Sequence, residues 1–136
     1  MTTREKLGNV ISWAGNELSE EYVALLMARG GQFCGELVRL YDVDEIIERN
    51  ETYETKTYCP GFLTIGDDSG GRAVVIALGR ARSPVYLVDH GYMSPDGFAT
   101  VASDIATWVA NGFAVDVQAL AKNGSDIVCR QSVLRP

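Results

Sequence analysis

The chain has 136 residues, 46% of them apolar and 22% charged, which is the composition of an ordinary globular domain rather than a disordered chain. A net charge of −6 argues against a nucleic-acid-binding protein, because such proteins normally present a basic face. No run approaches the ~18 apolar residues of a membrane span, so we expect no membrane segment. The charged N-terminus and three widely spaced cysteines without a Cys-x-x-Cys pair favour a cytoplasmic protein with free thiols.

The N-terminal segment predicts two helices. Apolar residues recur at helical spacing from Leu7 to Ala14, and the glycine at position 15 ends this first helix. Ser19 is the expected N-cap of the second helix, because two glutamates follow it in the first turn, where the helix macrodipole favours acids. Gly30 is a suitable C-terminal stop for that helix.

The next segment predicts a strand, a short helix and a loop. Residues 36–41 alternate in the manner of a strand. A short helix is expected over residues 43–50, with Asp42 as its N-cap. The polar residues 51–58 show no apolar periodicity, and we therefore expect a loop there.

Three strands are predicted in the middle of the chain, over residues 62–65, 72–78 and 85–89. The loop of residues 66–71 joins the first two as a hairpin with a long turn. The middle strand is apolar on both of its faces, so we expect it to be central in the sheet and covered on both sides.

The rest of the chain predicts a turn and a closing helix. Residues 94–97 carry a strong turn signal, and a helix opens at Ser103 and Asp104 with Ile105, Trp108 and Val109 as its buried face. Residues 116–122 weakly favour helix, and residues 127–134 are expected to be extended. The whole pattern indicates one α+β domain over residues 1–136, with a mostly antiparallel sheet and flanking helices.

Acidic side chains are the candidate partner-binding residues. One run lies between positions 42 and 54, and a pair of aspartates follows the first central strand; together they are Asp42, Asp44, Glu45, Glu48, Glu51, Glu54, Asp67 and Asp68. Like charges one helical turn apart repel each other, and acidic faces speed association with basic partners. The alternative interpretation is an ordinary solvated helix face, which the charge run alone supports slightly better than binding.

A serine-protease interpretation of the Asp68-Ser69-Gly70-Gly71 segment is disfavoured. The segment is similar to the nucleophile loop of trypsin-like proteases, but the single histidine, His90, follows the serine instead of preceding it. The alternative is a glycine-rich turn in which the aspartates bond to nearby backbone donors. We therefore expect no catalytic residues.

A metal site built from Asp67, Asp68, Asp89 and His90 is also disfavoured. Adjacent residues of a strand point to opposite faces, so at most one of Asp89 and His90 would join the aspartate pair. The alternative is that these residues anchor loops. We expect neither a metal nor any other cofactor.

Several segments, taken in order, resemble the SUKH superfamily in its Smi/Knr branch. The resemblance is carried by residues 18–31, residues 40–46, the segment Pro60-Gly61-Phe62-Leu63-Thr64-Ile65-Gly66-Asp67-Asp68-Ser69-Gly70-Gly71, residues 85–90 and residues 101–108. It covers about residues 18–113. No single motif is strong, and the resemblance is specific because four motifs occur in the right order.

The resemblance implies a non-enzymatic binding protein with a curved central sheet. Bacterial members of the family are typically immunity proteins that neutralise secreted or contact-dependent toxins, often nucleases, whereas fungal members resemble regulatory scaffolds. We therefore expect an immunity protein bound to a basic toxin domain, with a Smi/Knr-type regulatory scaffold as the alternative. Asp44, Glu48 and Glu51 are the first-choice contacts, and the protein itself is expected to be a monomer or a weak homodimer.

Overall fold

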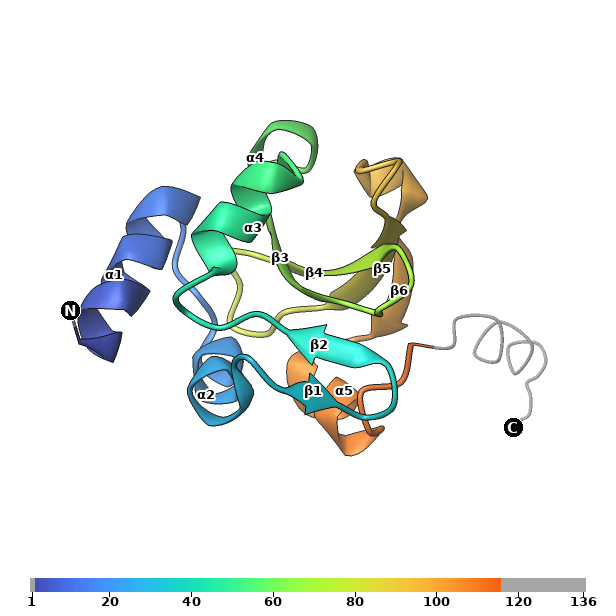
Figure 1. Ribbon diagram of the computed structural model, residues 1–136, viewed down its shortest axis with the longest axis horizontal. Coiled ribbons are helices and arrows are strands. Elements are labelled where there is room, and N and C mark those ends of the chain that lie inside the picture. Colours follow the sequence, from blue (N-terminus) through green and yellow to red (C-terminus); the bar gives the residue numbers. More distant parts are fainter. Residues whose placement is uncertain (1, 116–136) are drawn as a thin grey trace.

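The computed structural model describes residues 2–115, which form an α+β domain around one open sheet (Figure 1). In that range six antiparallel strands follow one another across the sheet in chain order. The elements are α1 (Thr3–Ala14), α2 (Glu20–Arg29), β1 (Phe33–Cys34), β2 (Val38–Leu40), α3 (Ile46–Thr52), α4 (Thr55–Tyr58), β3 (Phe62–Asp67), β4 (Arg72–Ala77), β5 (Val85–Asp89), the 3₁₀ turn η1 (Pro95–Gly97), β6 (Ala99–Ala102) and α5 (Ile105–Ala110). The predicted fold class is confirmed.

The end of α1 and both ends of α2 are where the sequence predicted them, and α1 begins before the predicted apolar stripe, at Thr3. Thr2 caps α1 in a reciprocal capping box with Glu5, and Gly15 ends the helix in the left-handed region with φ of 75°. Ser19 caps α2 by accepting a hydrogen bond from the backbone N–H of Tyr22. Both helices therefore begin and end where local sequence chemistry places them.

The predictions for the acidic segment were wrong in two respects. The helix α3 begins at Ile46 and not at residue 43, because Asp42 opens a turn in which its carbonyl accepts from the backbone N–H groups of Glu45 and Ile46. Asp42 is therefore not the helix N-cap. The expected loop of residues 51–58 instead contains the end of α3 and the short helix α4. The buried residue of α4 is the polar Thr55, so apolar periodicity could not reveal this helix.

The central strands are arranged as predicted. β3 and β5 flank β4, with Leu63 opposite Ile76 and Tyr86 opposite Val75. β4 is buried along nearly its whole length and contributes side chains to hydrophobic clusters on both faces of the sheet. The edge strands β1 and β6 were not predicted, and β2 is shorter than the expected residues 36–41; β1 and β2 are very short, so their sequence pattern carries little signal.

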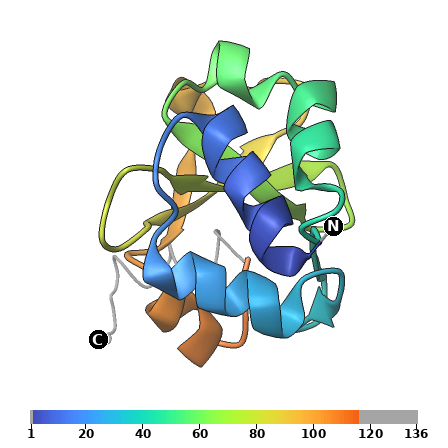
Figure 2. The same ribbon diagram turned by 90° about the vertical axis from the view of Figure 1, so that its left-hand side faces the viewer.

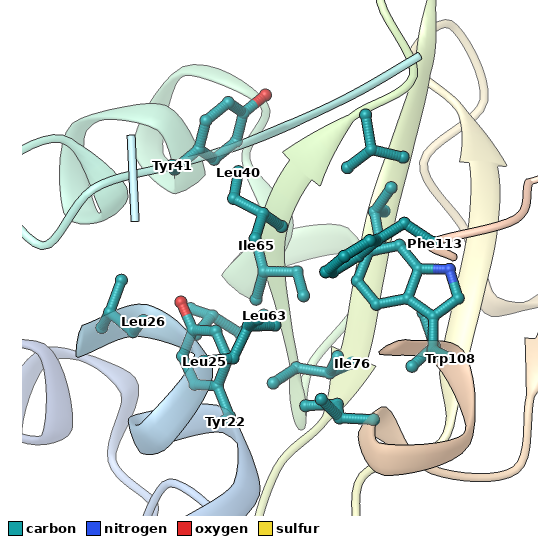
Figure 3. Close-up of a cluster of buried hydrophobic side chains, with 14 of the residues drawn as sticks. Tyr22, Leu25, Leu26, Leu40, Tyr41, Leu63, Ile65, Ile76, Trp108 and Phe113 are labelled. Carbon is teal, nitrogen blue, oxygen red and sulfur yellow. The ribbon is translucent and has the colours of Figure 1, made fainter. Parts of the chain in front are cut away.

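The main core lies between the sheet and the helices α2 and α5 (Figure 3). Its largest fully buried side chain is Trp108, whose indole N–H donates to the carbonyl of Ala114 at 3.1 Å. Val109 was expected to join this core but is 41% exposed. Phe113 takes that role instead, since it is buried and packs edge-on against Trp108 with ring centroids 5.0 Å apart.

A smaller cluster covers the opposite face of the sheet. Its buried members are Cys59, Ala73, Val75, Val88 and Met93. In Figure 1, α3 and α4 rise from one side of this face, and the segment around η1 rises from the other. Cys34 and Cys59 are both buried free thiols. No helix within residues 2–115 has the length and apolar character needed to cross a membrane. The predictions for residues 116–122 and 127–134 lie outside the described residues.

Candidate protein-binding site

The structure uses Asp68 to hold the turn between β3 and β4. Its carboxylate is almost completely buried; Oδ1 accepts from the backbone N–H groups of Gly70 and Arg72, and Oδ2 accepts from Arg72 Nε at 2.7 Å. Burial alone raises the pKa of Asp68, but these hydrogen bonds and the Arg72 charge together lower it by more, so its pKa lies below the ordinary value. The carboxylate faces the protein and not the solvent.

Asp67 belongs to the same turn and is also occupied. Its Oδ2 accepts from the Tyr41 hydroxyl at 2.9 Å, and its Oδ1 accepts from the backbone N–H of Ser69 at 3.0 Å. Ser69 has a left-handed backbone with φ of 65°, and its hydroxyl donates to the carbonyl of Leu37. Asp67, Asp68 and Ser69 therefore fix a loop, as the alternative interpretations of this segment expected.

The other two candidate metal ligands are engaged elsewhere. Asp89 Oδ1 accepts from the backbone N–H of Gly91, and the His90 ring stacks on Tyr53 with centroids 4.2 Å apart and planes 13° apart. Within residues 2–115, no three His, Cys, Asp or Glu side chains are placed to hold a metal ion together.

Two acids of the 42–54 segment have mainly internal roles. Asp42 accepts from the backbone N–H of Val43 and lies against Gly30, where a Cβ would come within 3.0 Å of its carboxylate. Glu45 accepts from Arg39 Nη2 at 2.8 Å and from the Asp42 backbone N–H at 3.0 Å. Burial tends to raise the pKa of Glu45, but these hydrogen bonds and the charges of Arg39 and Arg49 produce a net lowering.

Four acids of the segment keep exposed side chains, and the last three of them follow one another at three-residue intervals. Asp44 is exposed but pairs with Lys6, because α1 lies beside α3 (Figure 2). Glu48 is 66% exposed; Thr52 Oγ1 donates a hydrogen bond to it at 2.9 Å, and Arg49 Nε forms an ion pair with it at 3.6 Å. Glu51 and Glu54 are exposed and have no side-chain partner among the described residues. We call Glu48, Glu51 and Glu54 the acidic edge.

A buried asparagine fixes the acidic edge to the sheet. Asn50 has no exposed surface; its Nδ2 donates to the carbonyls of Ile46 and Thr64, and its Oδ1 accepts from the Thr64 backbone N–H, all at 2.8 Å. The side-chain amide therefore pairs with both backbone groups of one β3 residue. Thr55 of α4 adds a hydroxyl contact to the Thr64 side chain at 2.9 Å. Asn50 was not predicted as a buried residue. Its position on the inner face of the predicted helix, three residues after Ile47, was the one feature of the sequence that indicated burial.

The comparisons place this α+β domain in a family. The sequence matches the SMI1 / KNR4 family (SUKH-1) over residues 1–111, which is most of the chain. The chain belongs to this family, and the resemblance proposed from its motifs is confirmed. The match begins before residue 18, so the family domain includes α1. A comparison with curated proteins found no match.

Proposed function

We propose that this protein is a non-enzymatic cytoplasmic immunity protein that binds a cognate toxin domain and covers its active site. Membership of the SUKH-1 family supports this function, since bacterial members resembling this chain are typically immunity proteins. The observation that carries the proposal is the acidic edge, whose three glutamates are exposed on and just after α3, a short helix that Asn50 ties to the sheet. A rigid, charged surface of this kind suits the recognition of an oppositely charged protein.

The charge of the chain fits a basic toxin such as a nuclease. Nuclease active sites are basic because they hold phosphates, and a net charge of −6 attracts such a partner over long range. Within that field, the acidic edge supplies local complementarity that orients the encounter. Internally bonded acids such as the buried Asp68 and the partly exposed Glu45 contribute to the long-range field, but they offer little contact surface.

Capture of the partner and a protection assay test the proposed function. The full chain is used as bait in lysate of its native cells, and each captured protein is identified. The C-terminal domain of the captured protein is then expressed in a host with and without this chain. We expect the domain to be toxic alone and harmless with the chain. A captured domain that harms no cells under either condition would contradict the immunity function and favour the regulatory scaffold.

A further inference from the structure

A groove lies between α4 and the segment that follows β5. It has a volume of about 540 Å³ and is lined by Thr52, Tyr53, Glu54, Tyr58, His90, Gly91, Tyr92, Met93 and Ser94. The lining residues come from the end of α3, the helix α4 and the segment that leads from β5 into η1, elements that can be located in Figure 1. We call it the tyrosine groove.

Aromatic side chains form its walls. Tyr58 on the α4 side is 54% exposed, and Tyr92 on the η1 side is 57% exposed, and both are among the exposed large hydrophobic side chains of residues 2–115. Tyr53 precedes both of them in sequence and is stacked on the His90 ring. Exposed tyrosines on both sides of one hollow present two aromatic faces to an entering group.

The groove is held in shape by the surrounding structure. Tyr53 is fixed by its stacking on His90 and by a 3.4 Å hydroxyl contact with the buried Tyr41. The Tyr92 ring packs against Gly97, where an added Cβ would lie only 2.8 Å from the ring atom Cδ2. Gly97 therefore provides the space that this tyrosine occupies. A preformed site loses less conformational entropy when a ligand enters.

The charge of the groove favours a cation. Glu54 is the one carboxylate among the lining residues, and no lysine or arginine lines the groove. Glu54 is also the last member of the acidic edge, so the edge and the groove share this carboxylate. Tyrosine faces attract cations through the ring quadrupole, and a carboxylate beside them adds a charge-assisted hydrogen bond.

We propose that the tyrosine groove binds an arginine side chain of the protein partner, an inference that rests on the proposed function for the identity of that partner. Arginine fits better than lysine because its planar guanidinium stacks on an aromatic ring while its edge N–H groups still reach a carboxylate. Tyrosine and arginine are enriched among the residues that dominate binding energy at protein interfaces. The acidic edge attracts the partner, and the groove anchors it.

A peptide titration tests the groove without the toxin. The full chain is titrated with an acetylated, amidated Gly-Arg-Gly peptide while NMR follows the aromatic signals of Tyr53, Tyr58, Tyr92 and His90. The matched probe is the same peptide with citrulline, which keeps the shape of arginine but has no charge. We expect saturable shifts with the arginine peptide and at least about tenfold weaker binding of the citrulline peptide, a factor equal to about 1.4 kcal/mol. Equal binding of both peptides, or no shift with either, would overturn the proposal.

Variants identify the groove as the binding site. Glu54→Gln, the double change Tyr58→Ala with Tyr92→Ala, and Gly97→Ala, which displaces the Tyr92 ring, should each weaken the arginine peptide. Phe33→Ala is the control, since Phe33 is a 67% exposed aromatic residue on β1 and does not line the groove. Glu54→Gln keeps every aromatic side chain, so it remains informative if the double variant does not fold. Binding that survives Glu54→Gln and Gly97→Ala unchanged would refute the assignment.

Failure of this proposal can be separated from failure of the proposed function. If the captured toxin is neutralised but the arginine peptide does not bind, the immunity function stands and the groove proposal is wrong. If the peptide binds in the groove but no captured domain is toxic, the groove binds arginine and the toxin-neutralising function is wrong.

Discussion

The β3–β4 turn and the helix α3 are both rich in carboxylates, yet their side chains have opposite roles. In the turn, Asp67 and Asp68 accept hydrogen bonds from Tyr41, Arg72 and nearby backbone N–H groups, so they stabilise the fold. On α3 and just after it, the acidic edge of Glu48, Glu51 and Glu54 is exposed to solvent. The comparison shows that the donors within reach of a carboxylate, and not the local density of acids, decide whether it stabilises the protein or remains available to a partner.

The same rule divides the acidic segment itself. Glu45 faces Arg39 of the neighbouring strand, and Asp44 meets Lys6 of α1, so both carry internal ion pairs. Glu51 and Glu54 lie beyond the reach of these cations. The first-choice contacts named from sequence, Asp44, Glu48 and Glu51, therefore differ in how far each is already engaged within the protein.

The largest effect is expected from Asn50→Ala, which detaches the acidic edge from the sheet. The change leaves the buried backbone N–H and carbonyl of Thr64 without their partner, and we expect a loss of about 3 kcal/mol in the free energy of unfolding. Denaturant unfolding measures it, with the neighbouring exposed Glu51→Ala as the control, expected within about 0.5 kcal/mol of the parent. A loss below about 1 kcal/mol would mean that Asn50 does not hold α3 in place.

Asp68→Ala should have the next largest effect and tests the inward half of the comparison. Removing the carboxylate leaves two backbone N–H groups and the Arg72 side chain without an acceptor. We expect the free energy of unfolding to fall by about 2 kcal/mol because this hydrogen-bonded pair is buried on the aspartate side. The same denaturant experiment measures the loss. A loss in the free energy of unfolding as small as that of Glu51→Ala would show that Asp68 does not stabilise the fold.

The pH dependence of stability sharpens the same point. The pKa of Asp68 is lowered on folding, so its charged form stabilises the protein at pH values above the unfolded pKa of about 4. That stabilisation is lost as the pH falls through the lower pKa of the folded state. The stability difference between the parent protein and Asp68→Asn should therefore be constant above about pH 4 and should narrow below it. Curves that stay parallel throughout would contradict the pKa shift.

The smallest effect on stability is expected from neutralising the acidic edge. Glu48→Gln, Glu51→Gln and Glu54→Gln replace exposed carboxylates, so each change should alter the free energy of unfolding by no more than about 0.5 kcal/mol. Thermal unfolding of the triple variant checks this. A large loss of stability would show that these glutamates support the fold in the same way as Asp68.

The sequence predicted the elements that local chemistry determines. The Ser19 cap and the strand β4, apolar on both faces, were both found as expected, and the family motifs predicted the fold class. The helix α4 was missed because its inward contact is the hydroxyl of Thr55 and not an apolar side chain. The tyrosine groove was missed because Tyr58 and Tyr92 are distant in sequence and come together only in the folded domain.

The central claim, that the acidic edge steers a basic partner, is tested most directly by the association rate of the captured toxin domain as a function of salt concentration. The edge variant Glu48→Gln, Glu51→Gln, Glu54→Gln is compared with a control that neutralises Glu17, Glu20 and Glu36, which are also exposed. Both variants lose the same net charge. The account predicts a drop of about tenfold in the low-salt association rate and a weaker salt dependence for the edge variant, with a smaller change for the control. Equal rates for the two variants would contradict it.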